Sequence, residues 1–142
     1  MVIRVTHDTV FVDTSFWIAL LTSGDQNYHA AQDFDMRGLR IVTSELVLAE
    51  LLNYFANKDV HFKQFVVDYI VALQSRSDIK IVALRDTNFA QAFADYQKFL
   101  DQKWGLVDCA SFAIMRKLNI DTALTFDADF KQAGFKRAPE WP

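Results

Sequence analysis

Short apolar runs alternate with longer helical patterns along this chain, and that alternation limits the fold more than any other feature of the sequence. Runs of Val, Ile, Leu and Phe between loop residues predict strands. We expect strands at residues 10–12, 40–43, 79–84, 123–125 and 135–137. We expect helices at residues 15–21, 28–35, 45–58, 60–75, 88–102, 107–118 and 127–133. Strands that alternate with helices form βαβ units, so the sequence predicts a three-layer α/β/α fold with a mostly parallel central sheet.

The composition agrees with one α/β domain. The chain has 142 residues, a usual length for a single domain, so we expect one domain over residues 1–142. Its 4 Gly and 2 Pro are too few for a turn-rich β-sandwich or barrel. Hydrophobic residues make up 51%, with 13 Phe, which is more than a core of this size needs. We expect the surplus to form an apolar patch and the chain to form a homodimer.

Cysteine content and hydropathy point to the cytoplasm. Cys109 is the only cysteine, which excludes a disulfide framework and any metal site built on several cysteines. No apolar run approaches the roughly 18 residues of a membrane-spanning helix, and the N-terminus has no apolar signal-peptide region. We therefore expect a cytoplasmic protein. The net charge of -3 provides no overall positive field, so a nucleic-acid substrate would need a local basic patch or a metal ion.

Four carboxylates fall where the predicted fold brings side chains together. Asp13 directly follows the first predicted strand and Asp127 lies two residues past the fourth, so both belong at the edge where parallel strands end. Asp108 lies in the first turn of a predicted helix. Glu50 lies inside an apolar helix with no Lys or Arg within a turn, which predicts that it is buried or lines a cavity.

Each carboxylate also has a purely structural interpretation. Asp13 and Asp127 can cap helices, Asp108 can stabilise its helix through the dipole, and Glu50 can lie on a solvated flank. As a group, carboxylates that converge without basic partners repel one another unless a cation lies between them. Oxygen ligands favour Mg²⁺ or Mn²⁺ over zinc, and such cations serve phosphate chemistry.

Five segments in order carry a resemblance to a known family. They are VFVDTSFWIAL, DQNYHAA, TSELVLAELLNYF, WGLVDCASFAIM and ALTFDADFKQAGF. Together they resemble the PIN-domain ribonucleases, in particular the VapC-like branch, over nearly the whole chain. The resemblance implies hydrolysis of RNA phosphodiester bonds with Mg²⁺ or Mn²⁺, a homodimer and, for toxin members, an antitoxin protein as partner.

The resemblance also assigns residues. It implies an acidic catalytic and metal-binding site made of Asp13, Glu50, Asp108 and Asp127. The polar helpers of the family map to Thr14 or Ser15 and to Thr125, and Ser111 lies three residues after Asp108 on the same helix face. Two positions depart from the family pattern: Val107 replaces a threonine, and Asp129 replaces a common histidine and adds a carboxylate.

An RNA substrate predicts basic side chains around the acidic pocket. The candidates for RNA binding are Arg116, Lys117, Lys131, Lys136 and Arg137. Two other functions stay open: a PIN fold that binds without catalysis, and an RNA-processing nuclease outside toxin–antitoxin biology. Loss of an acid would indicate the silent binding module, and all four acids are present.

Overall fold

A five-stranded parallel sheet forms the centre of the protein, as the sequence predicts. The computed structural model describes residues 8–140. The strands are β1 (Thr9–Val12), β2 (Arg40–Ser44), β3 (Ile79–Val82), β4 (Thr122–Leu124) and β5 (Lys136–Ala138). They are ordered β3-β2-β1-β4-β5, and every neighbouring pair is parallel. Because all strands run the same way, their carboxyl ends meet at one edge of the sheet.

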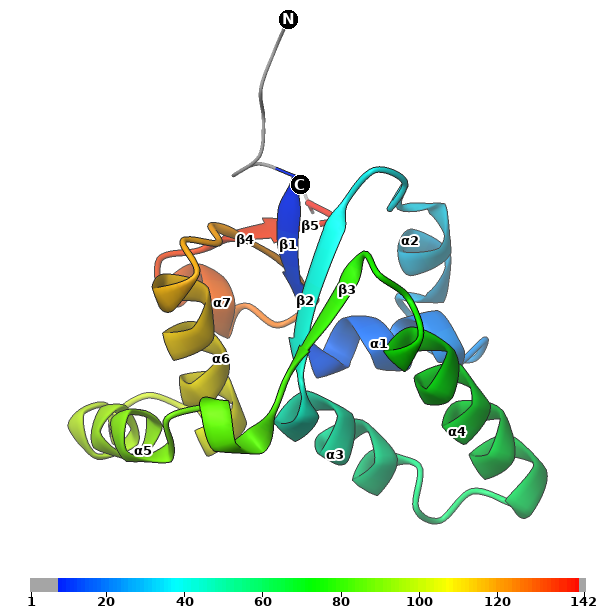
Figure 1. The fold of residues 1–142 in the computed structure, drawn as a ribbon, viewed down its shortest axis with the longest axis horizontal. Coiled ribbons are helices and arrows are strands. Elements are labelled where there is room, and N and C mark those ends of the chain that lie inside the picture. The colour runs from blue at the N-terminus through cyan, green and yellow to red at the C-terminus, as the bar shows by residue number, and fades with distance from the viewer. Residues whose placement is uncertain (1–7, 141–142) are drawn as a thin grey trace, which may run out of the picture.

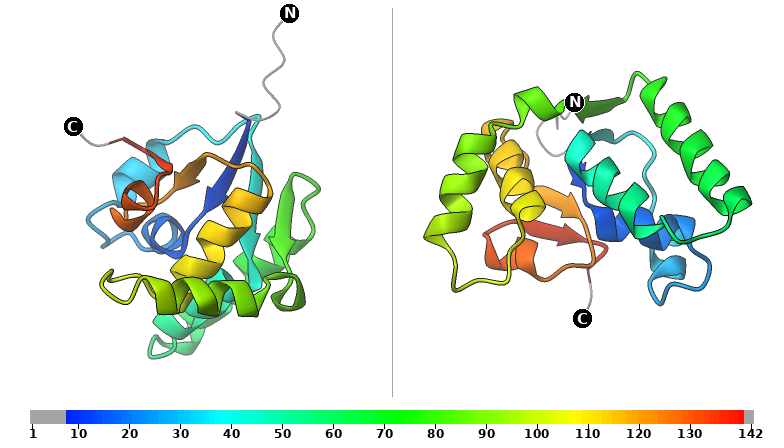
Figure 2. Two further views of the ribbon diagram at one scale, coloured as in Figure 1. Left: turned by 90° about the vertical axis from the view of Figure 1, so that its left-hand side faces the viewer. Right: turned by 90° about the horizontal axis from the view of Figure 1, so that it is seen from below.

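Helices cover both faces of this sheet. They are α1 (Thr14–Leu21), α2 (Tyr28–Asp33), α3 (Glu45–Tyr54), α4 (Val60–Gln74), α5 (Phe89–Lys98), α6 (Leu106–Lys117) and α7 (Asp129–Gln132). A 3-10 helix at Leu84–Asp86 follows β3. Figure 1 shows α1 to α4 on one side of the strands and α5 to α7 on the other, and Figure 2 gives the same grouping. The three-layer α/β/α prediction is therefore confirmed.

The core is built from the strands and the helix faces that cover them. Phe11 and Val12 in β1 and Ala123 and Leu124 in β4 are fully buried. These strands read as continuous apolar runs because both faces of a parallel sheet are covered. No helix within residues 8–140 is long and apolar enough to span a bilayer.

Helices α3 and α4 follow one another along the chain and are joined by a short loop. The two adjacent helical patterns predicted a protruding hairpin in which residues 58–75 pair with the preceding helix. In the structure α3 ends at Tyr54, and the helices meet near the loop, where the rings of Phe55 and Phe62 lie 5.0 Å apart. Further along, α4 packs on α1 through Tyr69 and Trp17, whose rings lie 6.1 Å apart. Figures 1 and 2 show α3 and α4 running in opposite directions on either side of the connecting loop, which agrees with the predicted hairpin.

The central strands position the first site residue. Val12 is paired with Leu124 in the β1–β4 register, and the next backbone N–H, that of Asp13, donates to the Leu124 carbonyl at 3.1 Å. The chain then turns directly into α1 at Thr14. Asp13 and Thr125 are thus the first residues past two neighbouring strands, on the edge where open α/β sheets bind ligands.

Candidate active site

An acidic cavity of about 550 Å³ opens at the carboxyl edge of the sheet. The four acids predicted from the sequence all line it, together with two hydroxyl residues and three other side chains. The lining residues are Asp13, Thr14, Ser15, Ile18, Glu50, Asn53, Tyr54, Asp108 and Asp127. Segments separated by more than 100 residues in sequence therefore bring their carboxylates to one place.

Asp13 is the buried centre of this cavity, with 4% of its surface exposed. Its Oδ2 accepts hydrogen bonds from the hydroxyls of Ser15 and Thr125, both at 2.9 Å, and from the Ser15 backbone N–H at 3.4 Å. Asp13 is also the N-cap of α1, as its structural interpretation predicts. Burial raises the pKa of Asp13 to about 6, and the hydrogen bonds from Thr125 and Ser15 oppose part of that rise.

The two hydroxyls around Asp13 belong to one network. Ser15 Oγ and Thr125 Oγ1 lie 3.0 Å apart. Ser15 Oγ accepts from the backbone N–H of Phe126, and Thr125 Oγ1 accepts from the backbone N–H of Asp127. Because those N–H groups donate to the hydroxyl oxygens, the hydroxyl protons are free to point at the carboxylate. The network fixes Asp13 against the start of the loop that carries Asp127.

Asp108 lies in the first turn of α6, as predicted. Its Oδ2 accepts from the backbone N–H of Gly105 at 2.9 Å. Burial raises the pKa of Asp108 to about 7, and the charges of Asp13, Asp127 and Glu50 add to the rise. The favourable position at the helix N-terminus does not offset these effects, so the fold by itself disfavours the ionised form of this group.

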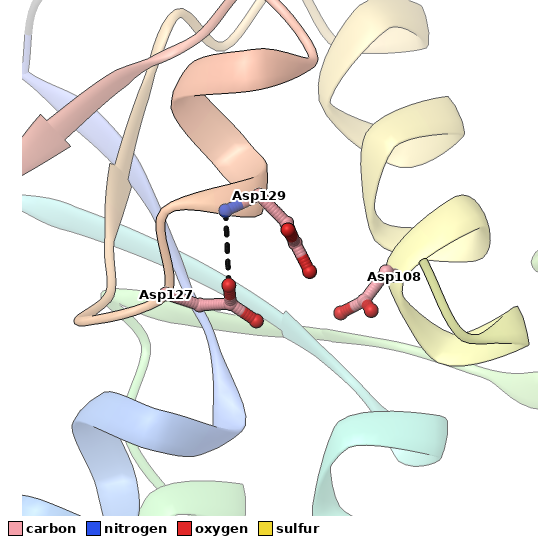
Figure 3. Close-up of side chains that lie close together, drawn as sticks. All are labelled: Asp108, Asp127 and Asp129. Carbon is pink, nitrogen blue, oxygen red and sulfur yellow. Dashed lines mark hydrogen bonds between the residues drawn. The ribbon is translucent and has the colours of Figure 1, made fainter. Parts of the chain in front are cut away.

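Asp127 and Asp129 complete an acidic cluster with Asp108. The three residues offer carboxylate oxygens that all lie within 4.8 Å of one another (Figure 3). The backbone N–H of Asp129 donates to Asp127 Oδ1 at 2.9 Å, which holds Asp127 at the turn before α7. Burial and the charge of Asp127 raise the pKa of Asp129, and the charge of Lys103 opposes that rise.

Glu50 lines the cavity but is exposed rather than buried. Its Oε1 accepts a hydrogen bond of 2.5 Å from the hydroxyl of Thr14. The sequence predicted burial or a place on a cavity wall, and the second of these is confirmed.

Other predicted residues lie away from the cavity. Ser111 is buried, and its hydroxyl donates to the Val107 carbonyl at 2.8 Å within α6. None of the five basic candidates lines the acidic cavity. Three of them, Lys131, Lys136 and Arg137, line a separate cavity with Phe135. Arg116 lies 3.4 Å from Asp95 and over the Phe135 ring, and with Lys117 it ends α6, far along the helix from Asp108.

Four further residues near the acids were not among the predicted site residues. Ile18, Asn53 and Tyr54 line the cavity, and Lys103 lies close enough to Asp129 to affect its pKa. Asn53 and Tyr54 are three and four residues after Glu50, so helical periodicity alone places them on the same flank. Lys103 lies in the loop before α6, for which the sequence offers no comparable signal.

The donor set of this cavity fits a divalent cation. It contains carboxylate and hydroxyl oxygens and no Lys or Arg among the described residues that line it. Without a cation, burial raises the pKa of Asp13 and of Asp108 toward the protonated forms, and like charges add to the rise for Asp108. A hard cation such as Mg²⁺ or Mn²⁺ would lower these pKa values and favour the ionised carboxylates. Oxygen donors are its preferred ligands.

Comparison with known proteins agrees with this geometry. The family model described as PIN domain matches residues 10–136. The 23S rRNA-specific endonuclease VapC20 of Mycobacterium tuberculosis, from strains CDC 1551 and H37Rv, is 30% identical over 127 residues, covering 89% of this chain and 95% of the relative. A crystal structure of Mycobacterium tuberculosis VapC20, described as a sarcin–ricin loop cleaving toxin, superposes with a TM-score of 0.77 at 29% identity. It covers 89% of this chain and 95% of that one.

Proposed function

Because this chain belongs to the PIN-domain family, we propose that it is a divalent-metal-dependent ribonuclease that hydrolyses RNA phosphodiester bonds. The observation that carries the proposal is the convergence of Asp13, Glu50, Asp108 and Asp127 on one cavity whose lining, within residues 8–140, has no basic side chain. Such a cavity repels a phosphodiester unless a cation reverses its sign. The four acids come from the ends of β1 and β4 and from helices α3 and α6.

The cavity residues would have different roles in the proposed reaction. Asp108, Asp127 and Asp13 would hold Mg²⁺ or Mn²⁺, with Glu50 at the outer wall. When bound, the cation polarises the phosphoryl oxygen and lowers the pKa of the attacking water. Ser15 and Thr125 keep the Asp13 carboxylate in place by hydrogen bonds to one of its oxygens. Thr14 does the same for Glu50, whose other oxygen can orient water in the open cavity.

We further propose that the protein is the toxin of a toxin–antitoxin pair. The support is the relationship to VapC20, which is described as a toxin that cleaves the sarcin–ricin loop. A ribosomal RNA loop of that kind is therefore the first substrate to test. The partner would be an antitoxin protein, and the setting would be the cytoplasm, where the free and buried Cys109 stays reduced.

Residues 1–142 are proposed to act as one domain that forms a homodimer. The support for the dimer is an exposed apolar face on α5 and the residues around it. Its members are Leu84, Phe89, Phe93, Tyr96 and Leu100. Phe89, Phe93 and Tyr96 recur at helical spacing within α5, so they share one side of the helix, and Leu84 and Leu100 lie before and after it. Sedimentation equilibrium should give about twice the 16.3 kDa of one chain, and a 16 kDa species at micromolar concentration would contradict the dimer.

The decisive experiment is RNA cleavage under metal control. A synthetic sarcin–ricin loop hairpin from 23S rRNA is incubated with the protein in EDTA, in Mg²⁺ and in Mn²⁺. We expect cleavage with either metal and none in EDTA. Cleavage in EDTA would contradict the metal-dependent reaction. RNA binding without cleavage in any metal would instead favour the silent binding module, and cleavage without growth arrest on expression would favour RNA processing.

A further inference from the structure

The acidic cavity has one wall that the chemistry does not use. Its acids and hydroxyls come from Asp13 to Ser15, Glu50, Asp108 and Asp127, whereas Ile18, Asn53 and Tyr54 carry neither a carboxylate nor an aliphatic hydroxyl. These three lie on α1 and α3, the helices that also carry Thr14, Ser15 and Glu50. The cavity therefore has an apolar and amide wall beside Glu50.

Tyr54 is the most prominent part of that wall. It is the last residue of α3 and 60% of its surface is exposed. Its ring meets Phe55 edge to face, at 5.1 Å and 84°. Phe55 is itself buried in the core, so this contact ties the Tyr54 ring to a fixed neighbour while most of the ring remains in solvent.

Its location separates Tyr54 from the other exposed apolar residues. Among the described residues there are exposed large side chains on α4 and α5, and none of them lines the acidic cavity. Tyr54 is one helical turn past Glu50, which places the two Cβ atoms roughly 5–6 Å apart. Asn53 beside it is also exposed and presents amide donors and an acceptor. An exposed aromatic ring and an amide next to a phosphate-cleaving site match what an unpaired nucleobase requires.

We propose that Tyr54 stacks on an unpaired base next to the scissile phosphate and that Asn53 hydrogen-bonds the edge of that base. This inference rests on the proposed ribonuclease function and adds two residues that would contact the base beside the cleaved bond. Bases inside a duplex are already stacked and their edges are paired, so they cannot reach this wall. Ile18 completes the apolar surface from α1.

The test compares Tyr54→Ala, Tyr54→Phe and Asn53→Ala with the wild type. Steady-state cleavage of the sarcin–ricin loop hairpin in Mg²⁺ gives kcat and KM. Binding is measured separately by fluorescence anisotropy of a fluorescein-labelled single-stranded RNA octamer, with each variant carried on Asp13→Asn so that the RNA stays intact. Phe65→Ala is the matched control, since it removes an exposed ring on α4 outside the cavity.

We expect Tyr54→Ala to weaken octamer binding and raise KM by roughly 5- to 150-fold, the range that follows from losing one base–aromatic stack. Tyr54→Phe keeps the ring and should stay within about twofold of wild type, and Asn53→Ala should change base preference. Annealing the octamer to its complement should abolish the difference between Tyr54→Ala and its parent. Thermal midpoints should agree across the set, because these side chains are exposed.

The outcomes separate this inference from the function on which it rests. A wild type that neither binds nor cleaves either RNA would overturn the ribonuclease proposal. A cleaving wild type with Tyr54→Ala unchanged in KM and octamer binding would overturn the stacking role alone. The stacking role is also overturned if Tyr54→Phe loses as much binding as Tyr54→Ala, or if Phe65→Ala weakens binding equally.

Discussion

The two sides of the acidic cavity are built in opposite ways. On the sheet side, Asp13 is 4% exposed and accepts from both Ser15 and Thr125. On the α3 side, Glu50 is exposed and accepts from one hydroxyl, that of Thr14. A carboxylate fixed in a buried network keeps its geometry and interacts strongly with a cation, whereas an exposed one is screened by water. Under the proposed function, the sheet edge would therefore hold the cation, and α3 would form the open wall of the cavity that faces the substrate.

We expect the largest loss of RNA cleavage from a substitution on the sheet side of the cavity, at Asp13. Asp13→Asn keeps the shape of the side chain and removes its charge. We expect RNA cleavage in Mg²⁺ to fall by at least about 100-fold, beyond the 10- to 100-fold typical of residues behind a metal ligand. Without metal, the thermal midpoint should hold or rise, because a buried charge near Asp108 has been removed.

Asp33→Asn, an exposed acid at the end of α2, serves as the control and should change neither quantity. Full activity of Asp13→Asn would contradict the assignment of this residue. Lost activity together with a collapsed midpoint would show that Asp13 acts mainly as the cap of α1.

In the absence of metal, the free energy of unfolding should depend on pH, and bound Mg²⁺ or Mn²⁺ should remove that dependence. The pKa of Asp13 is raised from 3.8 to about 6 and that of Asp108 to about 7, so between about pH 4 and 7 the folded state holds protons that the unfolded state has released. The free energy of unfolding therefore falls as pH rises through this window and levels off above it. Asp13 alone accounts for about 3 kcal/mol at full effect.

Denaturant titrations in EDTA at pH 4.5, 6 and 7.5 measure this decline. Millimolar Mg²⁺ or Mn²⁺ should raise stability at pH 7.5 and flatten the profile, since a ligand bound only by the folded state stabilises it. A wild type whose stability rises with pH in EDTA would contradict the raised pKa values. A midpoint that ignores both metals would contradict the site.

Substitutions on the α3 side of the cavity should reduce cleavage less, because Glu50 is exposed to water. Glu50→Gln should lower cleavage by about tenfold, less than Asp13→Asn does, since an exposed charge contributes less to holding a cation. Thr14→Val, which leaves Glu50 without its hydrogen bond, should give a loss of a few-fold. Cleavage rates under identical Mg²⁺ test the ranking. If Glu50→Gln equals or exceeds Asp13→Asn in its loss, the distinction between the two sides is wrong.

The same contrast explains how far the sequence could predict this protein. Asp13 and Asp127 follow short apolar strands, and parallel strands end at one edge, so their meeting follows from the βαβ pattern. The exposure of Glu50 does not follow from the sequence, because it depends on where α1 and α6 lie relative to α3. These helices are distant from α3 in sequence, and no local pattern reveals their placement.

The positions of the basic residues were predictable in part. Arg116 is eight residues past Asp108 in one helix, which places it about 12 Å along the axis at 1.5 Å per residue. Helix geometry alone therefore moves Arg116 and Lys117 away from the cavity. Lys103 beside Asp129 lies in a loop, where only the folded structure shows proximity.

The smallest expected effect is a change in metal affinity on substitution of Asp129, which lies on the same side of the cavity as Asp108 and Asp127. Asp129 joins Asp108 and Asp127 in one cluster of oxygens but carries no hydroxyl network like that of Asp13. Asp129→Asn keeps an oxygen donor and removes one negative charge, so metal affinity should weaken by roughly 3- to 10-fold, because ligand charge tunes the affinity of such sites. Titration calorimetry with Mn²⁺ measures this without reference to cleavage. Asp121→Asn, an exposed acid before β4 at the opposite edge of the sheet, is the matched control and should bind Mn²⁺ as wild type does. Unchanged affinity in Asp129→Asn would show that this carboxylate faces the cluster without contributing to the cation, and the three predicted aspartates with Glu50 would then account for the site.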